Sequence, residues 1–154
     1  MVALKAHQAD QALANPDKSF RVILIYGPDV GLVIERANLV AENCGVDGND
    51  PFSTIRLTAE DVAEDKSRLL DEAFTVGMFG GERLIRVSGT TRKNLFEAIK
   101  PVLENPPVDA WIIIEAGDLN NRSALRLGFE KSRHALAVPC YQDDAKAVEQ
   151  LIRD

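Results

Sequence analysis

Five short apolar segments alternate with helix-like segments along this chain, and this alternation most constrains its fold. The first segment, residues 20–26, is apolar apart from Arg21 and rich in β-branched residues, which predicts a strand buried on both faces. Because strands that alternate with helices pair in parallel, the pattern predicts an α/β fold with a five-stranded parallel sheet covered by helices. The other strands are predicted at residues 52–57, 82–87, 111–114 and 135–139.

The helices are predicted from apolar spacing and from the residues that begin or end them. One helix is expected to begin near Asp29, a good N-cap residue, and to end near Gly45. The acidic stretch after Thr58 predicts a helix in two pieces, with Asp65 capping the second. Pro101 lies inside a helical pattern and is expected to kink or end that helix. Further helices are predicted within residues 1–18, 95–103 and 122–131.

The last residues of the sequence have a helical pattern of their own. Their apolar stripe is still in phase at Asp154. We therefore expect residues 1–140 to form one domain and residues 141–154 to begin a further helical domain.

Composition excludes several classes of function. The net charge of −6 argues against binding nucleic acid through a basic face of this domain. No apolar run approaches the roughly 20 residues of a membrane span, and the N-terminus lacks the apolar stretch of a signal peptide. We expect a cytoplasmic protein with no membrane partner. Cys44 and Cys140 form no CxxC pair and no Cys/His cluster, so no metal site is predicted.

Residues 20–33 have the layout of a phosphate-binding loop, a strand followed by a glycine turn and a helix. Such a loop needs the pattern G-x-x-x-x-G-K-[ST], in which the lysine contacts phosphate and the hydroxyl contacts magnesium. Counted from Gly27, the last three positions hold Leu32, Val33 and Ile34. Asp29 lies in the loop and would repel phosphate. We therefore expect a turn kept for packing, with no nucleotide or other cofactor, although a diverged nucleotide-binding enzyme remains the alternative.

No other group of residues forms a recognisable catalytic arrangement. Glu115 and Asp118 follow an apolar strand and could hold a metal. Since the lysine and hydroxyl of a nucleotide site are missing, we interpret Glu115 as a surface acid or a partner for a helix end. His7 and His134 have no nearby serine or cysteine in a nucleophile arrangement. No catalytic residue is predicted.

Met78 and Phe79 form the most unusual pair in the sequence, because glycines bracket them on both sides. Glycine frees the backbone and removes neighbouring side chains, so such a loop can push two large apolar groups outward. The alternative is that both side chains fold back into the core. An exposed apolar pair of this kind can fill a hydrophobic pocket on a partner protein.

Three segments together resemble the N-terminal domain of the δ subunit of the bacterial DNA polymerase III clamp loader. They are YGPDVGLVIER, DEAFTVGMFGGERLIRV and LENPPVDAWIIIEAGDLNNRS. The resemblance covers essentially the whole chain as a pattern. It implies an AAA+-like domain in residues 1–140 without ATPase activity, and a helical lid domain that begins within residues 141–154.

The resemblance also implies a partner. Met78 and Phe79 match two apolar residues that enter a pocket on the β sliding clamp, so that the ring opens and DNA can enter. Methionine stands where leucine is more usual, and its similar volume should preserve binding. The implied further partners are the γ/τ and δ′ loader subunits, with DNA contacted only through the assembly. The rest of the expected clamp-binding segment is Val76, Gly77 and Gly80.

Overall fold

A parallel five-stranded sheet with the strand order β2-β3-β4-β1-β5 forms the centre of the structure. This computed structural model describes residues 6–47, 50, 52–75, 81–89 and 95–141. All four strand pairs are parallel, which confirms the predicted fold class. The strands are β1 (Val22–Tyr26), β2 (Thr54–Thr58), β3 (Arg83–Ser88), β4 (Ala110–Glu115) and β5 (Ala135–Pro139).

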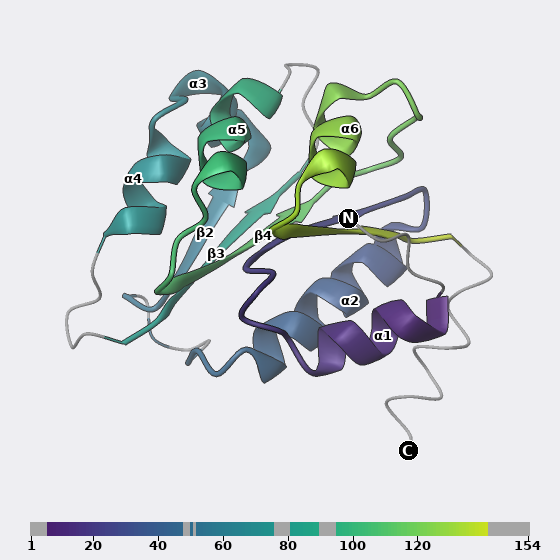
Figure 1. The fold of residues 1–154 in the computed structure, drawn as a ribbon, viewed down its shortest axis with the longest axis horizontal. Coiled ribbons are helices and arrows are strands. Elements are labelled where there is room, and N and C mark those ends of the chain that lie inside the picture. The colour runs from purple at the N-terminus through teal and green to yellow at the C-terminus, as the bar shows by residue number, and fades with distance from the viewer. Residues whose placement is uncertain (1–5, 48–49, 51, 76–80, 90–94, 142–154) are drawn as a thin grey trace.

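Helices cover both faces of this sheet. Figure 1 shows α1 and α2 on one face and α3, α4, α5 and α6 on the other. None of the helices in the described part of the chain is both long and apolar enough to cross a membrane. The helices are α1 (Ala6–Ala14), α2 (Val30–Asn43), α3 (Ala59–Glu64), α4 (Arg68–Phe74), α5 (Phe96–Glu104) and α6 (Ala124–Lys131).

The sheet has a separate apolar core on each face, because successive side chains of a strand point to opposite sides. Ile23 and Ile25 of β1 pack toward α1 and α2, together with Trp111 of β4. Val22 and Leu24 of the same strand pack toward the other helices. Both faces of β1 are therefore buried, as its continuous apolar sequence predicts.

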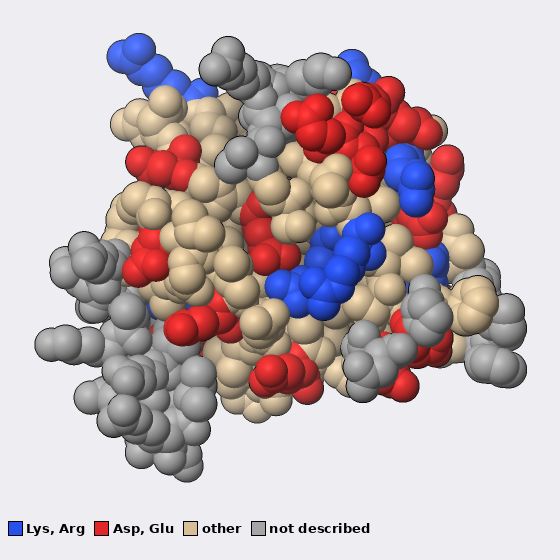
Figure 2. Space-filling view, turned by 180° about the vertical axis from the view of Figure 1, so that it is seen from behind, with Lys and Arg blue, Asp and Glu red and all other residues tan. Residues whose placement is uncertain are grey.

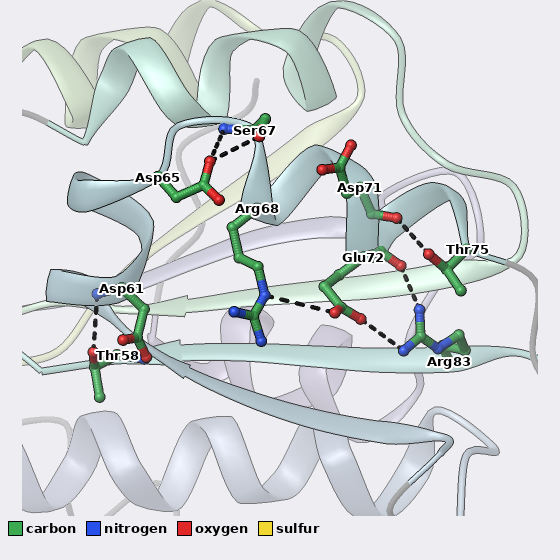
Figure 3. Close-up of polar contacts among 9 residues, drawn as sticks. All are labelled: Thr58, Asp61, Asp65, Ser67, Arg68, Asp71, Glu72, Thr75 and Arg83. Carbon is green, nitrogen blue, oxygen red and sulfur yellow. Dashed lines mark hydrogen bonds and ion pairs between the residues drawn. The ribbon is translucent and has the colours of Figure 1, made fainter.

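The acidic helix is in two pieces, α3 and α4, as the sequence predicts. Thr58 begins α3 with a capping box, in which its hydroxyl accepts from the N–H of Asp61 and the Asp61 carboxylate accepts from the N–H of Thr58, both at 3.0 Å. In the break before α4, the Asp65 carboxylate accepts from the N–H and hydroxyl of Ser67, at 3.1 and 2.7 Å (Figure 3). The expectation that Asp65 caps the second piece is wrong, because the N-cap residue of α4 is Ser67, and no side-chain hydrogen bond caps this helix.

The expectation that Pro101 kinks or ends its helix is wrong about the end, since α5 continues to Glu104. A proline inside a helix costs about 3 kcal/mol, because one hydrogen bond is lost and the ring crowds the preceding turn. The next two residues, Val102 and Leu103, are buried against the sheet. Burial of two such side chains contributes roughly 1.5–3 kcal/mol each, which is enough to offset the proline.

Candidate functional site

The turn between β1 and α2, where the sequence suggests a degenerate nucleotide loop, is closed by hydrogen bonds within the protein. The Gly27 N–H donates to the carbonyl of Gly117 at 3.1 Å, and the Asp29 N–H donates to the carbonyl of Cys140 at 3.5 Å. The Asp29 carboxylate caps α2 by accepting from the Leu32 N–H at 3.0 Å. A phosphate loop offers such N–H groups to its ligand. Here each of the three already has an acceptor.

The second glycine, lysine and hydroxyl positions of this loop pattern hold the apolar residues Leu32, Val33 and Ile34. Leu32 and Val33 are only 2% and 4% exposed and pack in the core between α2 and the sheet. Ile34, at the hydroxyl position, is 46% exposed and lines a pocket of about 550 Å³. The structure therefore brings Gly27, Asp29, Leu32 and Val33 together at the start of α2, without a cationic or hydroxyl side chain among them.

A buried ion pair forms one wall of the same pocket. Arg86 donates from Nε and Nη2 to the two carboxylate oxygens of Glu115, at 3.1 and 3.2 Å, and from Nη1 to Asn38 Oδ1 at 2.9 Å. The interpretation of Glu115 as a surface acid or helix-end partner is therefore wrong. It fails because Arg86 lies on the adjacent strand β3 and reaches Glu115 across the sheet.

The two carboxylate oxygens of Glu115 are thus already occupied by a guanidinium. Within the described residues, no group of three or more histidine, cysteine or acidic side chains could hold a metal ion. The pocket is also lined by Arg56 and Ser88. Of its described lining residues only Glu115 is acidic, and that carboxylate is paired with Arg86, so the pocket lacks the free carboxylate that holds magnesium in a phosphoryl-transfer site.

The second candidate site is the expected clamp-binding segment between α4 and β3. Val76, Gly77, Met78, Phe79 and Gly80 all lie outside the described residues. The structure describes the two flanks of this segment. The N-terminal flank is the end of α4, where the Thr75 hydroxyl donates to the carbonyl of Asp71 at 2.6 Å. The C-terminal flank is the start of β3.

Arg83, at the start of β3, joins these two flanks (Figure 3). Its guanidinium donates from Nη1 to the carbonyl of Glu72 at 2.6 Å and from Nη2 to the Glu72 carboxylate at 2.8 Å. Its Nε donates to the carbonyl of Phe52 at 3.1 Å, which adds the segment before β2. Arg83 is only 5% exposed. One buried cation therefore holds together the points where the chain leaves α4 and enters β3.

This role of Arg83 was not predicted from the sequence. The available signal was an arginine at the first position of a mainly apolar strand, following a helix that carries an acid in its last turn. Phe74, beside the N-terminal flank, is 48% exposed, so apolar surface is already present at the edge of this segment.

Replacement of Arg83 by methionine is expected to lower the free energy of unfolding by about 2–3 kcal/mol. The reason is that Glu72 loses its buried partner and two carbonyl groups lose their donor. Arg68→Met is the matched control, because Arg68 contacts the same carboxylate at 3.6 Å from an exposed position. That change should cost less than about 0.5 kcal/mol. Urea denaturation measures both; equal losses would contradict the role assigned to Arg83.

Comparisons with known proteins find a relative in sequence and similar proteins in structure. No family model matches the chain. In sequence, the chain is 23% identical over 133 residues to a probable DNA polymerase III subunit delta of Rickettsia prowazekii, covering 86% of this chain. In structure, it is similar to the Bacillus subtilis DNA clamp loader delta protein, with a TM-score of 0.65, 18% identity and 88% of this chain covered. The predicted resemblance to DNA polymerase III delta subunits is confirmed.

A second solved structure extends the likeness in fold. It is a DNA polymerase III gamma subunit-related protein of Thermotoga maritima, with a TM-score of 0.60, 14% identity and 90% of this chain covered. The chain spans 38% of the Rickettsia protein, 42% of the Bacillus protein and 46% of the Thermotoga protein. The chain therefore spans less than half the length of each of these three proteins.

Proposed function

We propose that this chain is the N-terminal domain of a DNA polymerase III delta subunit and that it binds the β sliding clamp during DNA replication. Similarity in both sequence and fold to delta proteins carries this proposal. Met78 and Phe79 enter a pocket on the clamp, with Val76, Gly77 and Gly80 giving the loop its shape. The clamp ring is then held open at one interface, so that DNA can enter.

The proposed role requires no catalytic residue and no ATP hydrolysis in this chain. The N–H groups of Gly27, Asp29 and Leu32 already have acceptors, and Leu32 and Val33 are buried, which supports a subunit that does not hydrolyse ATP. We propose no cofactor. Residues 1–140 form the clamp-binding domain and residues 141–154 begin the lid domain.

The proposed assembly is the cytoplasmic clamp loader, in which this subunit works beside γ/τ and δ′ subunits. DNA is reached only through that assembly. In support, Figure 2 shows acidic side chains spread over the face that it displays, with one group of lysines and arginines near the centre. A broad basic surface, which binding of the phosphate backbone requires, is not seen on that face.

The direct test is binding of this chain to the sliding clamp encoded by the same genome, measured by surface plasmon resonance. We expect saturable binding, and a fluorophore pair placed across one clamp interface should report separation when the chain is added. A chain that is folded by circular dichroism and yet leaves the clamp unbound would refute the proposal.

The alternative, a diverged nucleotide-binding enzyme, rests on the strand-turn-helix layout around Gly27. We predict that Mg-ATP leaves the melting temperature of the chain unchanged. A ligand that binds the native state stabilises it, by about 2.7 kcal/mol at 100 times its dissociation constant. A rise in melting temperature with millimolar Mg-ATP, absent with Mg-pyrophosphate or magnesium alone, would favour the enzyme instead.

A further inference from the structure

The end of α4, which leads into the expected clamp-binding segment, has no positive charge of its own. α4 has only seven residues, and its last turn contains no basic residue. The last carbonyl groups of a helix have no partner within it and carry partial negative charge, so a cation placed there is stabilising. Arg83 supplies this cation from β3, since its Nη1 donates to the Glu72 carbonyl at 2.6 Å (Figure 3). A residue of the sheet therefore holds the end of the helix.

The backbone of Arg83 is itself fixed, because β3 is an interior strand of the sheet. The Arg83 N–H donates to the carbonyl of Asp109 at 3.0 Å, and Arg83 is paired with Ala110 of β4. On the other side, the N–H of the next residue, Leu84, donates to the carbonyl of Ser53 at 2.7 Å. The side chain of Arg83 thus extends from a backbone that neighbouring segments hold on both sides.

The guanidinium of Arg83 is fixed in orientation as well as in position. Besides the bond from Nη1, its Nη2 donates to the Glu72 carboxylate at 2.8 Å and its Nε donates to the carbonyl of Phe52 at 3.1 Å. Because the group is planar and rigid, acceptors for all three nitrogens leave it a single orientation. Arg83 therefore fixes the end of α4 relative to the start of β3.

Residues 76–80 join these two fixed flanks. A segment whose ends are already held loses less conformational freedom when a partner orders it, and this lower cost raises affinity. Arg83 is only 5% exposed, so its side chain offers almost no surface to a partner. Any effect of Arg83 on binding must therefore act through the segment that it anchors.

We propose that Arg83 is a positioning residue for clamp binding. Its bonds to Glu72 and Phe52 hold both ends of the clamp-binding segment and so reduce the entropy that this segment loses on the clamp. This inference rests on the proposed function and deepens it, because it assigns part of the affinity to a residue that does not touch the partner.

The test is the affinity of two Arg83 variants for the sliding clamp, measured by surface plasmon resonance at a temperature where circular dichroism shows each chain to be folded. Arg83→Met keeps much of the side-chain length but removes all three donors, and should weaken binding about three- to tenfold. Arg83→Lys keeps the charge without the planar fork and should weaken binding about two- to threefold. The lysine variant provides the result if the methionine variant does not fold.

Arg86→Met is the matched control. Arg86 lies on the same strand and is 6% exposed, and its bonds to Glu115 and Asn38 involve neither flank of the clamp-binding segment. Its replacement also leaves an acid without its partner, so it should lower stability while clamp affinity stays at that of the parent chain. Equal weakening of clamp binding by Arg83→Met and Arg86→Met would mean that lost stability is the cause, and would overturn the positioning role.

Amide hydrogen exchange of the free chain gives a second readout. The Thr75 N–H donates at 3.4 Å to the same Glu72 carbonyl that Arg83 binds. Arg83→Met should speed the exchange of this amide, and Arg86→Met should not. A parent chain that fails to bind the clamp would refute the proposed function and this inference with it. A parent chain that binds, with Arg83→Met binding as tightly or leaving Thr75 exchange unchanged, would overturn this inference alone.

Discussion

Replacement of Met78 and Phe79 together by alanine is expected to lower affinity for the sliding clamp by about 100-fold or more. Burial of each side chain in a partner pocket contributes roughly 1.5–3 kcal/mol, and every 1.4 kcal/mol is about tenfold in affinity. Both residues lie between α4 and β3, whose ends Arg83 holds together through Glu72. Surface plasmon resonance with the immobilised clamp measures the loss.

A control for this change is available on α2. Val30 and Ile34 are 64% and 46% exposed, so their double replacement by alanine removes a comparable apolar pair from a different surface. We expect that variant to bind the clamp with unchanged affinity, and both double variants to melt close to the parent chain. If the Met78 and Phe79 variant instead melts far lower and keeps its clamp affinity, both side chains belong to the core and the proposed contact is wrong.

Local sequence patterns were sufficient to predict the sheet. Each predicted strand overlaps the observed one to within two residues at either end, because apolar runs buried on both faces contrast sharply with the polar turns around them. The start of α3 after Thr58 was equally readable, since Thr58 and Asp61 form a capping box that is local in sequence. The effect of Pro101 on α5 was not, because it depends on how strongly Val102 and Leu103 pack against the sheet.

In the candidate sites, too, features that depend on local sequence were predicted, and contacts between distant segments were not. The Asp29 cap and the apolar replacements at Leu32 and Val33 follow from local sequence, and the structure places all three at the start of α2. The partners of Arg83 and Arg86 were not predicted, because each contact joins segments that the fold brings together. Glu115 was misinterpreted for this reason, since its partner is 29 residues away in sequence.

Gly27→Ala is expected to be among the most damaging single changes in the chain, with a loss of about 2–5 kcal/mol in the free energy of unfolding. Gly27 has a φ of +148°, a backbone angle that residues other than glycine rarely adopt. A β-carbon there would overlap the carbonyl oxygen of Cys140 and lie 2.8 Å from its backbone nitrogen. Since both groups are backbone at the end of β5, neither can move away without breaking strand contacts.

Two other glycines separate the cost of backbone strain from the cost of the overlap with Cys140. Gly45 has a φ of +86° but open space around it, so Gly45→Ala tests backbone strain alone and should cost about 1 kcal/mol. Gly31 lies in α2, where a β-carbon would make an ordinary 3.5 Å contact with Asp29, so Gly31→Ala should gain up to about 1 kcal/mol. Urea denaturation of the three variants gives the comparison, and a Gly27 variant as stable as the Gly45 variant would contradict the packing role.

Stability measurements on Gly27→Ala also test why glycine occupies the first position of the nucleotide-loop pattern. If close packing against Cys140 requires Gly27, the glycine is needed whether or not a nucleotide ever binds. The stability lost in Gly27→Ala should then be identical with and without Mg-ATP, since neither variant nor parent gains stability from the ligand. A difference between the two conditions would mean that the turn still contacts nucleotide, and that the domain has kept the function its sequence pattern suggests.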